Sequence, residues 1–190
     1  MKIVLASRSP RRRELLKKII PEFDVRTAET DETLPVGIHP KDGVEILAVR
    51  KGQAVLGELS SDVLIISSDT LVELDGLALG KPSCEDDAVK ILLKLSGRTH
   101  NVHTGVAVHY KGRVFSGTDT SSVSFRSFDE VKAREYVMTG EPMDKAGAYA
   151  IQGIGAQFVE KYEGEFDTIV GLGLKLTARL IEEAQRNDEE

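Results

Sequence analysis

The chain has 190 residues, 41% of them hydrophobic, which is one domain's length and enough to bury a core. Its formal net charge of −6 argues against broad binding to nucleic acid, so any anion site must be local. The single cysteine, Cys84, excludes an internal disulfide and favours an intracellular setting. The apolar stretch in residues 1–6 is too short for the hydrophobic region of a secretory signal, and no run approaches the ~18 apolar residues of a membrane span. We therefore expect a cytoplasmic protein that binds neither membrane nor nucleic acid.

The first elements indicate a phosphate site. Residues 3–6 have the pattern of a short buried strand, and Ser9-Pro10 suits the start of a helix that opens with Arg11, Arg12 and Arg13. Cations are unfavourable at a helix N-terminus, which carries roughly half a positive charge, unless a multivalent anion binds there. The turn therefore favours a bound phosphate group. The alternative is a solvated, arginine-rich surface.

A second candidate site follows the next predicted strand. Residues 44–56 have helical spacing, and the continuous apolar run 63–66 predicts a strand that is buried on both faces. Asp69 comes directly after this strand, within Ser67-Ser68-Asp69-Thr70. Because ligands of open α/β sheets bind beyond the carboxyl ends of strands, Asp69 is well placed for catalysis.

Lys81 is expected to fold back toward Asp69. Asp75-Gly76 is a hairpin signal between the two, and Lys81 lies on a loop between Gly80 and Pro82. A carboxylate near lysine and arginine side chains fits phosphate chemistry, in which the carboxylate takes a proton from water or holds a metal ion. A surface salt bridge on a hairpin is the alternative.

The rest of the chain mixes helices and strands irregularly, which predicts an α/β protein with a mixed sheet. Capping-box patterns, Ser83 with Asp86 and Ser127 with Glu130, open helices over 83–95 and up to about residue 138. Strands are predicted at 102–108, at 114–115 after a turn at Lys111-Gly112, and at 121–125, 156–160 and 168–170. An amphipathic helix over 175–185 closes the chain, with a polar tail from about 185.

The segment 140–156 is rich in glycine and alanine, yet it is not polar enough for a linker. Small residues let the backbone approach a ligand closely. Gln152 could pair with the edge of a nucleotide base, because its amide both donates and accepts hydrogen bonds. A tightly packed structural loop is the alternative, and it explains the glycines but not Gln152.

Four motifs in this order resemble those of the Maf family, the septum-formation-inhibitor-like nucleotide pyrophosphatases, and the resemblance spans residues 5–174. The motifs are Leu5-Ala6-Ser7-x-Ser9-Pro10-Arg11-Arg12-x-Glu14-Leu15-Leu16; Ser68-Asp69-Thr70-x-Val72 with Asp75-Gly76-x-x-Leu79-Gly80-Lys81-Pro82; Ser96-Gly97-Arg98-Thr99-His100 with Thr104-Gly105-Val106; and Glu141-Pro142-x-Asp144-Lys145-Ala146-Gly147-Ala148-Tyr149-x-Ile151-Gln152-Gly153.

This resemblance implies a hydrolase that acts on an acid anhydride and converts a nucleoside triphosphate to the monophosphate and pyrophosphate. It implies a divalent metal cation as cofactor, such as Mg²⁺, Mn²⁺ or Co²⁺. The implied fold is a single Maf-like domain over 1–190, with an elongated mixed sheet, flanking helices and two lobes around a cleft. That fold is similar to the inosine triphosphatase group (Maf/Ham1-like).

The resemblance also implies roles for individual residues. Asp69 matches the proton acceptor, for a water that attacks the α-phosphorus directly or as a metal-bound water. The positions that match phosphate-binding residues are Ser7, Arg11, Lys51 and Lys81. The positions associated with substrate choice are Arg12, Thr70 and Gln152, a combination similar to the branch acting on dTTP and UTP rather than 7-methyl-GTP. Glu32 and Asp69 are candidate metal partners.

Two positions depart from the family pattern, and two other functions stay open. Gly173 stands where the family usually has proline, and Gly52 where it usually has alanine, at a cost of about 1 kcal/mol inside a helix. One alternative function is a non-catalytic, nucleotide-binding regulator of cell division. The other is a phosphatase that removes the terminal phosphate. A homodimer is compatible with the sequence.

Overall fold

A mixed sheet of seven strands forms the centre of the computed structural model, which describes residues 1–57, 59 and 62–186. β1 (Lys2–Leu5) lies between β2 (Asp24–Val25) and β3 (Val63–Leu74) and is parallel to both. The antiparallel strands β5 (Thr99–Tyr110), β6 (Arg113–Phe125) and β7 (Val159–Glu163) follow, and β4 (Leu77–Leu79) pairs with the second half of β3. The predicted mixed α/β sheet is confirmed.

Helices cover the two faces of the first lobe. One face packs against α1 (Pro10–Leu16), α5 (Phe166–Val170) and α6 (Leu174–Arg186), around Leu64 and Ile66 of β3. The opposite face, with Val63 and Ile65, is covered by α2 (Pro40–Leu56). Because side chains alternate along a strand, neighbouring residues of β3 belong to different cores.

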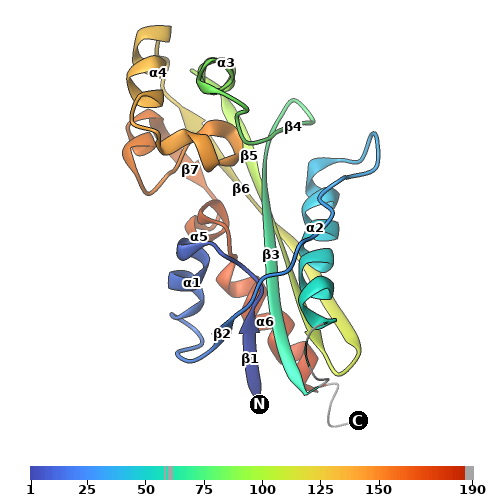
Figure 1. Cartoon of the computed structure of the whole chain (residues 1–190). Helices are drawn as coiled ribbons and strands as arrows, with labels where there is room; N and C mark the ends of the chain where they lie inside the picture. Colours follow the sequence, from blue (N-terminus) through green and yellow to red (C-terminus); the bar gives the residue numbers. More distant parts are fainter. Residues whose placement is uncertain (58, 60–61, 187–190) are drawn as a thin grey trace.

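The second lobe has a core of its own. It contains α3 (Glu85–Leu95), α4 (Glu130–Val137) and the 3₁₀ turns η1 (Glu141–Asp144), η2 (Ala146–Ala148) and η3 (Ile154–Phe158). Leu92, Phe125 and Tyr136 are among its fully buried side chains. The long strands β3, β5 and β6 run through both lobes and give the molecule its elongated shape (Figure 1).

Two glycines allow α2 to lie directly on the sheet. A Cβ atom on Gly105 of β5 would lie 2.5 Å from the carbonyl carbon of Val44 in α2. A Cβ atom on Gly52 would lie 2.7 Å from Ser67 Oγ and would overlap the His109 ring. Glycine at position 52 lowers the helix propensity of α2, but it is what allows the helix to pack this closely on the sheet. The close packing also sets the position of the neighbouring residue, Lys51, relative to β3.

Gly173 also has a steric reason. A Cβ atom there would lie 2.5 Å from Oδ2 of Asp119 on β6, so the carboxylate fills the space that a proline ring would need. The closing helix nevertheless begins at the next residue and continues to Arg186. It thus extends past residue 185, where we predicted a polar tail, and residues 187–190 lie outside the described part of the chain.

Several predicted boundaries are wrong, because tertiary contacts override local sequence signals. The strand predicted over 63–66 extends to Leu74, and the patterns at 114–115 and 121–125 belong to one strand, β6. The helix predicted from residue 44 begins at Pro40. Residues 168–170 form part of helix α5 rather than a strand, and residues 156–160 are divided between η3 and β7.

Neither predicted capping box forms. The α3 helix begins after Cys84, and Ser83 instead donates from its backbone N to Asp87 Oδ2 at 2.8 Å. The N-cap of α4 is Asp129, whose side chain accepts from Lys132 N at 2.9 Å. By contrast, the hairpin turns at 75–76 and 111–112 form as predicted, with positive φ at all four residues.

Candidate active site

One cleft of about 1010 Å³ contains every side chain that the sequence predicted for the site. This volume is at the upper end of the range for small-molecule pockets. The predicted residues in its lining are Ser7, Arg11, Arg12, Glu32, Lys51, Asp69, Thr70, Lys81 and Gln152. The complete lining includes six basic and five acidic side chains. Basic groups are therefore concentrated here in a chain whose net charge is −6.

The cleft opens where β3 has no neighbouring strand on one edge. On that edge β3 pairs with β1 as far as Ile66 and with β4 from Val72 onward. Asp69 and Thr70 lie between these two stretches. The prediction that Asp69 lies beyond the end of its strand is wrong, because β3 continues through it and Asp69 is opposite Gly105 of β5. Asp69 lies instead beyond the carboxyl end of the parallel neighbour, β1.

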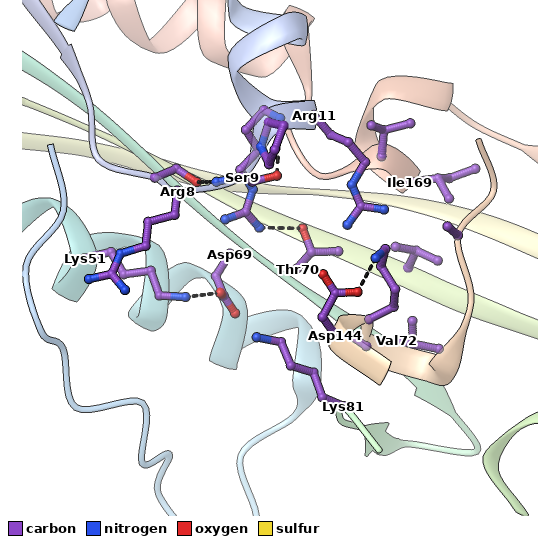
Figure 2. A pocket seen from close by; sticks show the side chains of 18 of the residues that line it. Arg8, Ser9, Arg11, Lys51, Asp69, Thr70, Val72, Lys81, Asp144 and Ile169 are labelled. Atoms are coloured by element: carbon purple, nitrogen blue, oxygen red, sulfur yellow. Dashed lines mark hydrogen bonds and ion pairs between the residues drawn. The ribbon is translucent and has the colours of Figure 1, made fainter. Parts of the chain in front are cut away.

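Lys51 joins two carboxylates on the α2 side of β3. Its ammonium group donates to Asp69 Oδ1 and lies 2.8 Å from Glu32 Oε1 (Figure 2). Asp69 is 8% exposed, so its carboxylate is largely shielded from water and is paired with the Lys51 ammonium group. The Lys51 hydrogen bond lowers the pKa of the Glu32 carboxyl, and burial of the group opposes that effect only in part. The contact therefore brings both carboxylates to one point.

Arg12 and Thr70 lie on the other face of β3. The Arg12 guanidinium donates through Nε to Gly171 O at 2.8 Å, through Nη1 to Ser68 O at 2.9 Å and through Nη2 to Thr70 Oγ1 at 3.2 Å. Burial lowers the pKa of this guanidinium, although the charge of Asp69 opposes that effect. Thr70 Oγ1 also lies 2.9 Å from Thr104 Oγ1. Arg12 thus fixes the hydroxyl of Thr70 in addition to lining the cleft.

The three consecutive arginines have different environments. Arg11 points into the cleft (Figure 2), Arg12 is half-buried, and Arg13 is exposed. The predicted helix start forms: Ser9 is the N-cap, its Oγ accepts from Arg12 N at 3.4 Å, and Pro10 is the first helical residue. Ser7 Oγ accepts from Ser9 N at 3.2 Å. The turn is therefore ordered by serines, and its arginines are directed to separate places.

Lys81 approaches from the second lobe. It follows β4, and its side chain points toward Asp69 in Figure 2. Its loop is tied to the 140–156 segment, because Gly147 N donates to Gly80 O at 3.1 Å. Gln152 lies in that same segment, exposed at the cleft.

The chain has relatives among known proteins. The family model described as Maf-like protein matches residues 2–184. This chain belongs to the Maf-like family. A protein of Pelotomaculum thermopropionicum named dTTP/UTP pyrophosphatase is 47% identical to it over 190 residues, covering 94% of both chains. A protein of the same name from Thermococcus kodakarensis is 41% identical over 180 residues, covering 95% of both chains.

The fold of this Maf-like chain also has a solved counterpart. The Ham1 protein of Staphylococcus aureus aligns over 100% of both chains with a TM-score of 0.56 and 17% sequence identity. This likeness concerns the fold, and it confirms the expected Maf/Ham1-like architecture. Among the described residues, no helix is long and apolar enough to cross a membrane.

The Maf-like cleft also includes charged residues that the sequence analysis missed. Arg8 lines it and donates to Thr27 Oγ1 at 3.2 Å, and Asp144 forms an ion pair with Lys145 at the opposite wall. Arg8 stands between Ser7 and Ser9 of the first motif, and Asp144 and Lys145 belong to the fourth motif. Their positions within these motifs were the only sequence signal that could have identified them, because charged residues of these types are also common on solvated surfaces.

The residues of this Maf-like site fit a divalent cation that arrives with a nucleotide. Asp69 and Glu32 both contact the Lys51 ammonium group, so the two carboxylates converge on one cationic group. Mg²⁺ is commonly held by one or two carboxylates together with substrate phosphates and water. In the described part of the chain, no group of three or more His, Cys, Asp or Glu side chains could hold a metal by itself. The donor set therefore suits a cation that the phosphates help to bind.

Proposed function

We propose that this chain is a nucleoside triphosphate pyrophosphatase that hydrolyses dTTP and UTP to the monophosphate and pyrophosphate. One observation carries the proposal: Asp69, Lys51, Lys81 and Arg11 come from four separate segments and line one cleft. This arrangement suits a triphosphate, because the three cationic side chains can bind the phosphate chain while the Asp69 carboxylate remains near the α-phosphorus. The name of the relatives supports the choice of substrates.

The proposed reaction is attack by water on the α-phosphorus. Asp69 accepts the proton of the attacking water, and the bond between the α-phosphorus and the bridging oxygen breaks. Negative charge then develops on the leaving pyrophosphate, where Arg11, Lys51 and Lys81 stabilise it electrostatically. A divalent cation held by Asp69 and Glu32 would supply further charge neutralisation at the phosphate oxygens.

Base selection is assigned to the other side of β3 and to the loop around residue 152. Gln152 can donate and accept, which suits the 2,4-dione edge of uracil or thymine. The hydroxyl of Thr70 is held by Arg12 and Thr104, so it presents a fixed polar group. We further propose that the substrates are free nucleotides and that the protein acts in the cytoplasm, where an exposed free thiol such as Cys84 stays reduced.

A pyrophosphate-release assay tests the function. The purified chain is given UTP, dTTP, CTP, ATP and GTP with Mg²⁺, Mn²⁺ or Co²⁺, and both pyrophosphate and orthophosphate are measured. We expect pyrophosphate, with UTP and dTTP as the best substrates. Release of orthophosphate alone would identify a terminal phosphatase. No release from any nucleotide would favour the non-catalytic regulator of division.

The role of Asp69 has its own variant. Asp69→Asn should reduce kcat by about 10²–10⁴-fold, the usual contribution of a general base, while the far-UV circular dichroism spectrum stays the same. The matched control is Asp75→Asn, which removes an exposed carboxylate paired with Arg98 on the turn after β3. A folded Asp69→Asn enzyme with more than a tenth of wild-type kcat would exclude Asp69 as the proton acceptor.

A further inference from the structure

The loop that carries Gln152 is held by a carboxylate of the cleft wall. Glu141, the first residue of η1, accepts through Oε1 from Ile154 N at 3.0 Å and through Oε2 from Gly155 N at 2.9 Å. Its Oε2 also accepts from the Tyr136 phenol at 2.6 Å. The carboxylate lines the cleft, yet its hydrogen bonds are directed at the loop.

Two glycines of the loop are shaped around this pair. A Cβ atom on Gly153 would lie 2.6 Å from Cδ of Glu141, and one on Gly155 would lie 2.7 Å from the phenol oxygen of Tyr136. Side chains at either position would therefore displace the carboxylate or the phenol. This packing explains why both positions are glycine.

The same pair reaches the other end of the loop. Tyr136 is 1% exposed, and its phenol oxygen also accepts from Ala150 N at 3.3 Å. The backbone of Gly153 donates to Ala150 O at 3.3 Å. Residues 150 and 154–155 are thus tied to the pair formed by the buried Tyr136 phenol and the half-buried Glu141 carboxylate, and Gln152 lies between the tied points.

A direct chemical role for Glu141 fits these contacts poorly. Burial raises the pKa of its carboxyl, but hydrogen bonds from Tyr136, Gly155 and Ile154 outweigh that effect and bring the pKa below its ordinary value. A carboxylate that already accepts three hydrogen bonds is a weak base toward water. Of its roughly four acceptor sites, two are taken by the loop backbone and one by the Tyr136 phenol.

We propose that Glu141 and Tyr136 are positioning residues for nucleotide selection: they fix the 150–155 loop so that Gln152 meets the base. This inference rests on the proposed role of Gln152. The two residues act through the loop backbone, and they leave proton transfer and phosphate binding to the residues around Asp69.

Steady-state kinetics separate positioning from chemistry. Glu141→Gln and Tyr136→Phe should raise KM for UTP by about 5–20-fold and leave kcat within about 3-fold, the pattern of lost uniform binding. In a Gln152→Ala background neither substitution should raise KM further, because coupled residues are non-additive. A loss of kcat above 100-fold with unchanged KM, or fully additive effects on KM, would overturn the proposal.

Amide hydrogen exchange provides a readout that does not need turnover. In the wild type, the amides of Ile154 and Gly155 should be protected. Glu141→Gln leaves one oxygen acceptor in place of two, so the exchange of at least one of these amides should increase by about 10-fold or more, which corresponds to about 1.4 kcal/mol. Glu130→Gln, which removes a surface ion pair with Arg134 on α4, is the matched control and should change neither exchange nor KM.

The two readouts distinguish the inference from the function it rests on. Unchanged exchange in Glu141→Gln overturns the inference even if the wild type hydrolyses UTP. If the wild type releases no pyrophosphate, the proposed function fails. The Kd of UTP by calorimetry then takes the place of KM, and an equal Kd in wild type and Glu141→Gln overturns the inference. Tyr136→Phe keeps the buried ring, so it provides the same test if Glu141→Gln does not fold.

Discussion

Replacing Gly52 by alanine should destabilise the protein, although alanine is the better helix former. Helix propensity alone predicts a gain of about 1 kcal/mol. The added Cβ atom, however, would lie 2.7 Å from Ser67 Oγ and would overlap the His109 ring, whose residue is fully buried. Overpacking of this kind costs typically about 1–3 kcal/mol, so we expect a net loss of up to about 2 kcal/mol.

A double-mutant cycle isolates the contact. His109→Val removes the ring together with its two buried nitrogens. In that background Gly52→Ala should cost less than in the wild type, because only the close approach to Ser67 Oγ remains, so the two substitutions should couple by up to about 2 kcal/mol. Urea unfolding measures each free energy, and a loss of 2 kcal/mol corresponds to a Tm about 4–8 °C lower in a chain of this size.

The same substitution should affect activity, because residue 52 follows Lys51. If α2 moves away from β3 to accommodate the methyl group, the ammonium group moves away from Asp69, and kcat should fall in parallel with stability. A Gly52→Ala protein that is more stable than the wild type and equally active would refute the close helix–sheet contact and the positioning argument built on it.

Two further predictions concern the pH dependence of stability and the hydrogen bonds of the Arg12 guanidinium. His100 is 2% exposed, and burial lowers its pKa from the ordinary 6.5 to about 4. The folded protein therefore binds this proton only at a lower pH than the unfolded chain does. Stability is then complete above pH 6.5 and should decrease by about 3 kcal/mol toward pH 4, a decrease that His100→Leu should lack in urea titrations. A wild type and a His100→Leu variant with the same pH dependence would rule out this contribution. Arg12→Lys should lower stability by about 1–3 kcal/mol, because a lysine cannot serve the carbonyls of Ser68 and Gly171 together with the Thr70 hydroxyl. Arg12→Lys should also change the ratio of kcat/KM for UTP to kcat/KM for GTP. An unchanged ratio and an unchanged Tm would contradict the role assigned to the hydrogen bonds of Arg12.

The sequence predicted what depends on local chemistry. The hairpin at Asp75-Gly76 was predictable because those residues tolerate positive φ, and the apolar run 63–66 could only be buried. The resemblance to the family implied that Lys51, Lys81 and Asp69 belong to one site, and all three line the same cleft.

The sequence could not predict what depends on distant partners. Residues 168–170 have β-branched side chains, yet they form a helix, and Thr104 of β5 donates to the carbonyl of Thr168 at 2.7 Å. The polar middle of β3 was not recognisable as a strand because its stabilising contacts, such as Ser67 Oγ to Ala48 O at 2.7 Å, come from α2. The hydrogen bonds from Ile154 N and Gly155 N to Glu141 join residues at the two ends of an irregular segment, and such a segment has no periodic sequence pattern that could predict them.

Asp69 and Thr70 are consecutive residues whose side chains leave β3 in opposite directions. The proposed hydrolytic step and the proposed choice of base are therefore separated by a single peptide unit of a strand that both lobes share. An insertion or a one-residue slip at this point would exchange the two environments rather than adjust the distance between them. New substrate preferences in this scaffold would then arise from the residues that surround Thr70 and from the loop that carries Gln152, while the strand itself stays constant.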